Sequence, residues 1–148
     1  MTSLFFDLNV WLALSVSGHP HNGVAMGWLD QLPNDSTLIF SRYTQLGLLR
    51  LLTNTAVMGD ETVTLRKAWA VYDRWLQDPR VEFYPEPRNV EAGFRQATEP
   101  FAAKAATKWV GDCWLLAFAE ACNAQLVTFD QALYNFAQRQ GHRAVIPS

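Results

Sequence analysis

The chain has 148 residues, of which 49% are hydrophobic and 18% charged, and this length and composition predict one globular domain over residues 1–148. The formal net charge of −2 and the pI near 5.9 exclude bulk electrostatic attraction as a basis for nucleic-acid binding, so such a substrate needs a local rim of Lys and Arg. The lack of a long apolar run excludes a membrane span, and Asp7 interrupts the N-terminal run that a signal peptide would need. We therefore expect a cytoplasmic protein without a membrane partner.

Apolar runs and helix-like patterns alternate along the first half of the chain. Residues 4–6 and 37–41 are short apolar runs of strand length. Residues 8–14, 22–32 and 42–53 place apolar side chains at steps of three and four, which is typical of helices. The last of these helices is apolar around most of its circumference, so we expect it to be heavily buried.

The second half of the chain repeats this alternation. The pattern predicts helices over residues 62–76, 89–98, 113–121 and 131–140. It predicts further strands over residues 81–84, 125–130 and 144–146. Strands that alternate with helices through short polar loops indicate a three-layer α/β domain with a mainly parallel central sheet of four to five strands.

An acid stands where the first strand should end. Asp7 directly follows the apolar run at residues 4–6, and ligands bind beyond the carboxyl ends of the strands in open α/β sheets. Asp is also a favoured helix N-cap. Asp7 therefore belongs to a functional site or caps the following helix, and its position alone leaves both interpretations open.

Two further acids are expected at the same edge of the sheet. Asp130 ends the run at residues 125–130, and Asp112 precedes the helix predicted over residues 113–121. If the strands before Asp7 and Asp130 are parallel neighbours, the three carboxylates emerge together. We expect the helix dipole to help Asp112 and see no such help for the other two acids. Close like charges raise the pKa of at least one carboxyl group unless a cation lies between them.

A hard divalent cation would resolve this repulsion. Mg²⁺ and Mn²⁺ take oxygen ligands and are held by one or two carboxylates together with water and substrate phosphate. Such a site suits hydrolysis of a phosphodiester by a metal-activated water. The sequence has no nucleophile elbow, no glycine-rich phosphate loop and no zinc-type Cys/His cluster. His19 and His21 are poorly spaced for a metal, and we expect them to have a local structural role.

Several segments together resemble the PIN-domain ribonucleases, most closely the toxin component of bacterial VapBC-type toxin–antitoxin pairs. The segments are Leu-Phe-Phe-Asp7-Leu-Asn9, Gly-His-Pro-His before Ala25 and Trp28, Thr44-Gln45 through Arg50, Gly-Asp112, and Leu-Val-Thr128-Phe-Asp130. The resemblance covers nearly the whole chain in order and spacing. It implies an α/β/α PIN-like fold and a Mg²⁺- or Mn²⁺-dependent endoribonuclease that cuts structured or translation-related RNA.

The resemblance also implies roles for individual residues. Asp7, Asp112 and Asp130 match the metal-binding acids of the family. Asn9 matches a small polar residue that orients the first acid. Thr128 matches the polar residue before the last acid.

One position departs from the family pattern. Many PIN domains carry a glutamate early in the helix after the second strand, where this sequence has Gln45. A glutamine amide can ligate a cation or hydrogen-bond a water, but it brings no charge, so the number of metals is left open at one or two. Gln45 therefore either belongs to the catalytic set or is a helix-surface amide. Arg50 on the same helix could reach a phosphate or brace a carboxylate.

The resemblance implies three partners: an RNA substrate, a cognate antitoxin protein and a second copy of the chain in a homodimer. The apolar helices over residues 24–32 and 42–52 could bind the C-terminal segment of the antitoxin as a helix in a groove. The alternative is that their apolar side chains simply form the core.

Two other functions are left open. A phosphatase could use Asp7 as a covalent nucleophile, although such enzymes usually carry a second Asp two residues later, where this chain has Asn9. A catalytically degenerate PIN-like module could bind RNA or a protein if Gln45 marks lost catalysis. Three converging acids without a metal would be costly for such a module to keep.

Overall fold

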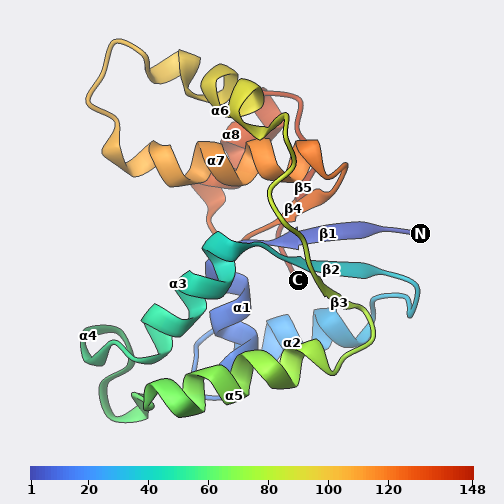
Figure 1. Cartoon of the computed structure of the whole chain (residues 1–148), viewed down its shortest axis with the longest axis vertical. Helices are drawn as coiled ribbons and strands as arrows, with labels where there is room; N and C mark the ends of the chain where they lie inside the picture. The colour runs from blue at the N-terminus through green and yellow to red at the C-terminus, as the bar shows by residue number, and fades with distance from the viewer.

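The computed structural model describes residues 1–148 and shows a parallel sheet between two layers of helices (Figure 1). The five-stranded sheet has the order β3-β2-β1-β4-β5, and every neighbouring pair is parallel. The strands are β1 (Ser3–Phe6), β2 (Thr37–Phe40), β3 (Val81–Phe83), β4 (Gln125–Val127) and β5 (Ala144–Val145). The predicted three-layer architecture is confirmed, and β1 lies at the centre of the sheet.

The helices divide between the two sides of the sheet (Figure 1). One side carries α1 (Leu8–Ser15), α2 (Asn22–Asp30), α3 (Arg42–Leu52), α4 (Thr55–Met58), the 3₁₀ turn η1 (Gly59–Glu61) and α5 (Leu65–Leu76). The other carries α6 (Val90–Thr98), the 3₁₀ turn η2 (Glu99–Phe101), α7 (Thr107–Ala121) and α8 (Gln131–Arg139). None of these helices has the length and apolar character needed to cross a membrane.

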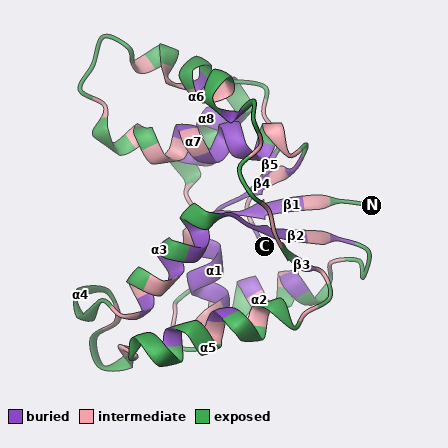
Figure 2. Cartoon of the chain, viewed as in Figure 1, coloured by how far each residue is buried: buried purple, intermediate pink, exposed green.

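The three inner strands, β2, β1 and β4, are buried on both faces, as expected for parallel strands covered by helices (Figure 2). Successive side chains of β1 point to opposite faces: Leu4 and Phe6 join the cluster on the α1–α5 side, and Phe5 joins the cluster on the α6–α8 side. The same alternation in β2 and β4 completes two separate hydrophobic cores. Each core holds one helix layer on the sheet.

Helix α7 begins six residues earlier than predicted, at Thr107 instead of residue 113. Its N-cap, Ala106, forms no side-chain capping hydrogen bond, so no local signal marks this start. The first turn is held by tertiary contacts instead, because the Trp109 ring stacks on Phe101 with centroids 4.9 Å apart and packs on Phe136 at 5.1 Å. This shift changes the environment of Asp112.

Helix α3 is less buried than its apolar composition predicts. Leu48 and Leu52 lie in the core, but the Leu46 side chain is 49% exposed. The expectation of heavy burial therefore holds within this chain only for the side of α3 that packs on α1 and α5. The opposite side is open to solvent or to a partner.

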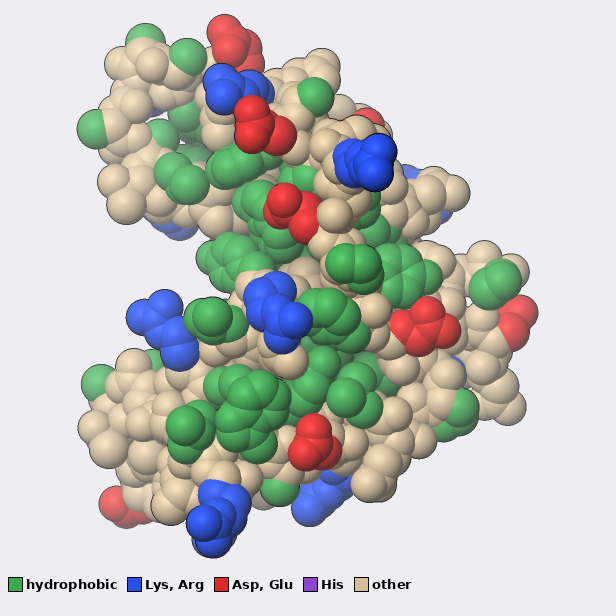
Figure 3. Space-filling view, in the orientation of Figure 1, with side chains coloured by type: hydrophobic (Ala, Val, Ile, Leu, Met, Phe, Trp, Pro, Cys, Tyr) green, Lys and Arg blue, Asp and Glu red, His purple; other side chains and the backbone are tan.

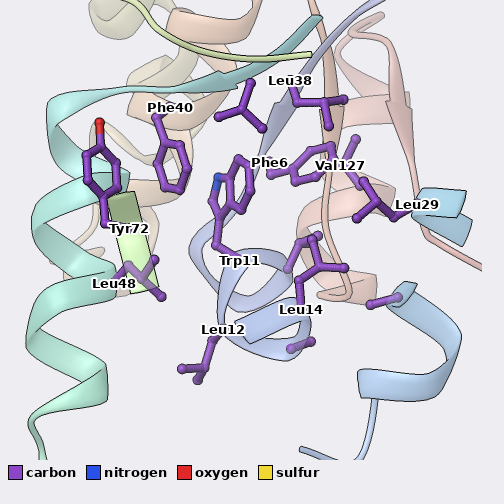
Figure 4. Packing of buried hydrophobic residues seen from close by; sticks show 14 of the residues in the cluster. Phe6, Trp11, Leu12, Leu14, Leu29, Leu38, Phe40, Leu48, Tyr72 and Val127 are labelled. Atoms are coloured by element: carbon purple, nitrogen blue, oxygen red, sulfur yellow. The ribbon is translucent and has the colours of Figure 1, made fainter. Parts of the chain in front are cut away.

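Trp11 on α1 lies at the centre of the core on the α1–α5 side (Figure 4). Its ring stacks on Phe40 with centroids 3.8 Å apart and packs on Phe6 at 4.7 Å and Trp75 at 5.6 Å. The side chain is fully buried, and its indole N–H has no hydrogen-bond partner. Ring packing rather than hydrogen bonding therefore holds Trp11 in place.

Replacing Trp11 should destabilise the fold strongly. We expect Trp11→Ala to lower the free energy of unfolding by about 3–5 kcal/mol, because it leaves a large cavity between α1 and the sheet. Trp69→Ala is the matched control, since Trp69 is 42% exposed, and should cost no more than about 1 kcal/mol. Urea titrations followed by circular dichroism measure both values, and similar losses in the two variants would contradict the packing argument.

Candidate functional site

Asp7 and Asp130 lie beyond the carboxyl ends of adjacent strands. Strands β1 and β4 are parallel neighbours with Phe6 opposite Val127, and the Asp7 N–H donates to the Val127 carbonyl at 2.8 Å. Strand β4 ends at Val127, so Asp130 lies on the short loop that follows it. The parallel pairing thus brings both acids to one edge of the sheet.

Each of these acids also caps a helix. Asp7 Oδ1 accepts a hydrogen bond from the Leu8 N–H at 2.6 Å at the start of α1, and Asp130 Oδ1 accepts one from the Leu133 N–H at 3.1 Å at the start of α8. Both interpretations of Asp7 therefore hold at once, because the cap and the sheet edge are the same place. The positive ends of α1 and α8 stabilise the two carboxylates.

Asp112 receives no such stabilisation, which corrects the prediction from the sequence. Because α7 begins at Thr107, Asp112 lies in its second turn, beyond the first turn in which the dipole acts. The dipole therefore helps Asp7 and Asp130 and not Asp112, the reverse of what we expected.

Thr128 and Asn9 connect the two strand-end acids. The buried Thr128 hydroxyl donates to Asp7 Oδ2 at 2.7 Å and accepts from the Asp130 N–H at 3.0 Å. The Asn9 amide donates to Thr128 Oγ1 at 3.5 Å, and its Oδ1 accepts from the Phe129 N–H at 3.2 Å. These bonds hold the loop after β4 against the start of α1, so both residues position the acids.

The three carboxylates lie close enough to affect one another's ionisation. Burial raises the pKa of Asp112 to about 6, the charges of Asp7 and Asp130 add to the rise, and Lys108 partly offsets it. Burial also raises the pKa of Asp7, against the hydrogen bonds from Thr128 and Leu8. Negative charge therefore accumulates at this edge of the sheet, and the charge of Lys108 offsets only part of it at Asp112.

The donor set fits a hydrated divalent cation. As placed, no three His, Cys, Asp or Glu side chains form a closed set of metal ligands. Both oxygens of Asp7 accept protein hydrogen bonds, whereas hydrogen bonding contributes nothing to the pKa of Asp112 and occupies only one oxygen of Asp130. Mg²⁺ suits such a site, because it keeps several waters and takes one or two carboxylates. Asp112 and Asp130 could hold the ion together with Asp7, because each Asp7 oxygen accepts one hydrogen bond and keeps a further lone pair.

The structure does not bring Gln45 to the acids. Its Oε1 accepts a hydrogen bond from Arg42 Nη1 at 2.6 Å. Burial raises the pKa of Tyr72 on α5, and hydrogen bonding to Gln45 partly offsets the rise, so the buried amide faces α5. Tyr43 lies two residues before Gln45 and therefore on the other side of α3, because such positions differ by about 200° around a helix. Burial raises the pKa of Tyr43, and the charges of Asp7 and Asp112 raise it further, so Tyr43 is the residue that faces the acids. Gln45 is therefore not part of this acidic site.

Sequence reasoning missed the side of α3 that does face the acids. Tyr43, Gly47 and Arg50 recur at steps of four and three residues, so they share one side of the helix. Arg50 forms no ion pair with any carboxylate, which removes the bracing role considered for it. The helical spacing was visible in the sequence, but which side of α3 packs on the core was not.

Comparison with known proteins identifies the family. Residues 4–139 match the model of the PIN domain. This chain belongs to the PIN domain family. The PIN domain is 39% identical over 137 residues to "Ribonuclease VapC41" of Mycobacterium tuberculosis, covering 90% of this chain and 92% of that protein. It is 27% identical over 146 residues to "Ribonuclease VapC39" of the same organism, covering 93% and 94% of the two chains.

Solved structures share the fold of this PIN domain. VapBC2 from Rickettsia felis, bound to a DNA fragment from its promoter, matches with a TM-score of 0.70 at 14% identity, over 99% of this chain and 100% of that chain. VapC20 of Mycobacterium tuberculosis, described as a sarcin-ricin loop cleaving toxin, matches with a TM-score of 0.63 at 17% identity, over 89% and 93%. The expectation of a PIN-like fold resembling VapC proteins is confirmed.

Removing the Thr128 hydroxyl should destabilise this PIN domain. Thr128→Val keeps the shape of the side chain but leaves Asp7 Oδ2 and the Asp130 N–H without their hydrogen-bond partner, so we expect a loss of about 1–3 kcal/mol in the free energy of unfolding. The control Thr55→Val alters an exposed threonine and should change it by less than about 0.5 kcal/mol. Urea titration at neutral pH provides the comparison, and equal effects would refute the role given to Thr128.

Asp112 should destabilise the metal-free protein above its pKa. Its pKa of about 6 exceeds the ordinary value, so the folded state binds the Asp112 proton more tightly than the unfolded state does. The stabilisation that this bound proton gives the folded state is lost as the pH rises from about 4 through about 6. We expect Asp112→Asn to raise the Tm by a few degrees at about pH 7.5 in EDTA, and to give no gain at about pH 4.5.

The matched control for this pH dependence is Asp60→Asn, because Asp60 is exposed and far along the chain from the site. It should leave the Tm nearly unchanged at both pH values when measured by differential scanning fluorimetry. A gain for Asp112→Asn that is equally large at both pH values would argue against repulsion among the three acids.

Proposed function

We propose that this PIN domain is a Mg²⁺- or Mn²⁺-dependent endoribonuclease and the toxin of a type II toxin–antitoxin pair. The observation that carries the proposal is the convergence of Asp7, Asp112 and Asp130 at one edge of the sheet, where burial, together with the charges of the other two acids, raises the pKa of Asp112 to about 6. RNA as the substrate is supported by two relatives that are named ribonucleases. A sarcin-ricin loop cleaving toxin among the structural neighbours agrees with this choice.

The residues of the site divide the work of such a reaction. Asp7, Asp112 and Asp130 would hold the cation, and the Leu8 N–H and the Thr128 hydroxyl fix the Asp7 carboxylate in place. When bound, the cation would lower the pKa of water at the site and offset negative charge at the scissile phosphate. Asn9 and Thr128 keep the acids in place, so the carboxylates need little rearrangement as substrate binds.

Phosphodiester substrate could enter between the two helix layers. Figure 3 shows a hollow between the upper and lower layers, with Lys or Arg side chains beside it. The charge of Lys108 on α7 lowers the pKa of Asp112, and the charge of Arg50 on α3 lowers the pKa of Tyr43 beside the acids. One cation therefore lies near the acids from each helix layer. These two side chains supply the local basic rim that the net charge of −2 makes necessary.

Exposed apolar side chains provide surface for protein partners. Leu46 on α3 is 49% exposed, and Leu65, Trp69 and Leu76 on α5 are 56%, 42% and 41% exposed. Figure 3 shows hydrophobic side chains gathered along this face. Structural neighbours include VapBC-1 from nontypeable Haemophilus influenzae, which supports an antitoxin as one partner of this chain, and a second copy in a homodimer would use the same kind of surface.

Metal-dependent RNA cleavage is the decisive test. A total small-RNA pool is incubated with the purified protein, freed of any co-purifying partner, in Mg²⁺ or Mn²⁺ and in EDTA. We expect fragments only with the metal. Asp7→Asn should cleave at least about 100-fold less, because mutating residues that merely hydrogen-bond metal ligands already lowers activity by about 10–100-fold. Fragment ends read by sequencing identify the target.

Asp60→Asn is the matched control, because it removes the same charge from an exposed position outside the site, and it should cleave as the wild type does. Cleavage by Asp7→Asn at the wild-type rate would rule out the acidic site as the catalytic centre. Folded wild-type protein that cuts nothing in either metal would instead favour a module that only binds RNA or protein.

A further inference from the structure

A surface cavity of about 440 Å³ lies beside the acids, between the start of α1 and the exposed side of α3. Its volume lies in the range of small-ligand sites. Its walls touch the chain next to two of the acids. Leu8, which follows Asp7, lines the cavity, and the Tyr43 hydroxyl at its rim lies against Gly111, which precedes Asp112. A ligand in this cavity would therefore be a direct neighbour of the acidic site.

An aromatic platform forms one wall of the cavity. Tyr43 is 43% exposed and stacks on Trp114 with ring centroids 5.1 Å apart and planes inclined by 25°. Trp114 is held in turn by a 2.9 Å hydrogen bond from its indole N–H to Glu86 and by an edge contact with Phe5 of β1. Contact with the fixed Trp114 ring thus holds the Tyr43 ring in place before any ligand binds, which favours stacking of a planar group on it.

Two helix-interior glycines make room for this arrangement. A Cβ at Gly47 would lie 2.5 Å from Leu8 Cδ2, and a Cβ at Gly111 would lie 2.7 Å from the Tyr43 hydroxyl oxygen. Glycine weakens a helix relative to alanine, yet α3 and α7 each carry one where they approach the cavity. The glycines let the Leu8 and Tyr43 side chains occupy the positions that shape its walls.

The rim of the cavity offers donors without partners. The exposed Arg50 guanidinium forms no ion pair or hydrogen bond with another side chain. Asn54 uses its Oδ1 to accept from the Ala56 N–H at 2.9 Å, which leaves its NH₂ group free to donate. Leu8, Leu46 and Leu51 provide apolar walls, so the cavity combines a flat apolar surface with a cation and an amide donor.

We propose that this cavity is a nucleobase subsite, in which the base next to the scissile phosphate of an RNA strand packs against Tyr43 and Leu8 while Arg50 binds the adjoining phosphate. The inference rests on the proposed ribonuclease function and adds a position at which the enzyme reads sequence. An apolar peptide side chain would fill the walls but leave Arg50 unpaired, whereas a nucleotide matches both the walls and the charge.

Cleavage specificity tests the base contact. RNA fragment ends produced with Mg²⁺ are sequenced for the wild type, Tyr43→Ala and the control Val57→Ala, which shortens an apolar side chain of similar exposure, 48% against 43%. We expect the wild type and Val57→Ala to share a base preference at one position beside the cut. Tyr43→Ala should reduce that preference by about tenfold, because stacking on an aromatic ring is lost.

Tyr43→Leu separates stacking from loss of fold. It keeps an apolar side chain against Trp114 but has no aromatic face, so it should remain folded, as judged by its Tm, and should also lose the base preference. A folded Tyr43→Leu variant with the wild-type preference would overturn the proposal.

Salt dependence tests the phosphate contact of Arg50. Binding of a short single-stranded oligoribonucleotide to the Asp7→Asn protein, measured by fluorescence anisotropy, should weaken in Arg50→Ala, and the slope of log K against log salt should fall by about one. Arg66→Ala removes an exposed arginine of α5 and should leave the slope unchanged. Equal slopes for both variants would overturn the role of Arg50.

The outcomes separate this inference from the proposed function. If the wild type cuts RNA and the Tyr43 variants keep its rate and base preference, the cavity is a protein-binding surface; the subsite is then refuted while the ribonuclease stands. If the folded wild type cuts no RNA under any metal, both proposals fail together.

Discussion

The parallel pairing of β1 with β4 is the constraint on which the rest of this structure depends. Parallel strands cannot be joined by tight turns, so each connection must cross over through helices, and these crossovers build the two helix layers. The same pairing sets Phe6 opposite Val127, and the chains that leave these residues carry Asp7 and Asp130. A site therefore forms where two strands end and two helices begin, which is also where backbone N–H groups are free to stabilise negative charge.

The three acids are stabilised unequally, and the inequality gives the site its chemistry. The start of α1 and the start of α8 hold the charges of Asp7 and Asp130, whereas Asp112 lies inside α7 with burial and two negative neighbours acting against its charge. A protein that needed only fold stability would gain from an uncharged residue at this position. The retained negative charge is consistent with a group whose partner is a cation or a phosphate-bound metal rather than another side chain.

Helix α3 serves two purposes through its two sides. The side of Leu48 and Gln45 packs on the core and α5, while the side of Tyr43 and Arg50 borders the acids and the neighbouring cavity. This division explains why a helix so rich in leucine is not buried all round. It also explains why the amide at Gln45, although matched by motif to a family glutamate, makes structural hydrogen bonds.

The sequence by itself determined the number of strands and the parallel α/β class, because apolar runs of strand length between helical patterns are local, whereas only the strand order made β1 and β4 neighbours and so brought Asp7 and Asp130 together. Its motifs also sufficed for the PIN resemblance. Only the tertiary structure decided where α7 begins and which side of α3 meets the acids. Helical periodicity shows that a side exists but not which neighbour it packs against, and the uncapped start of α7 depends on Trp109 packing on Phe101 in the preceding turn and on Phe136 in α8.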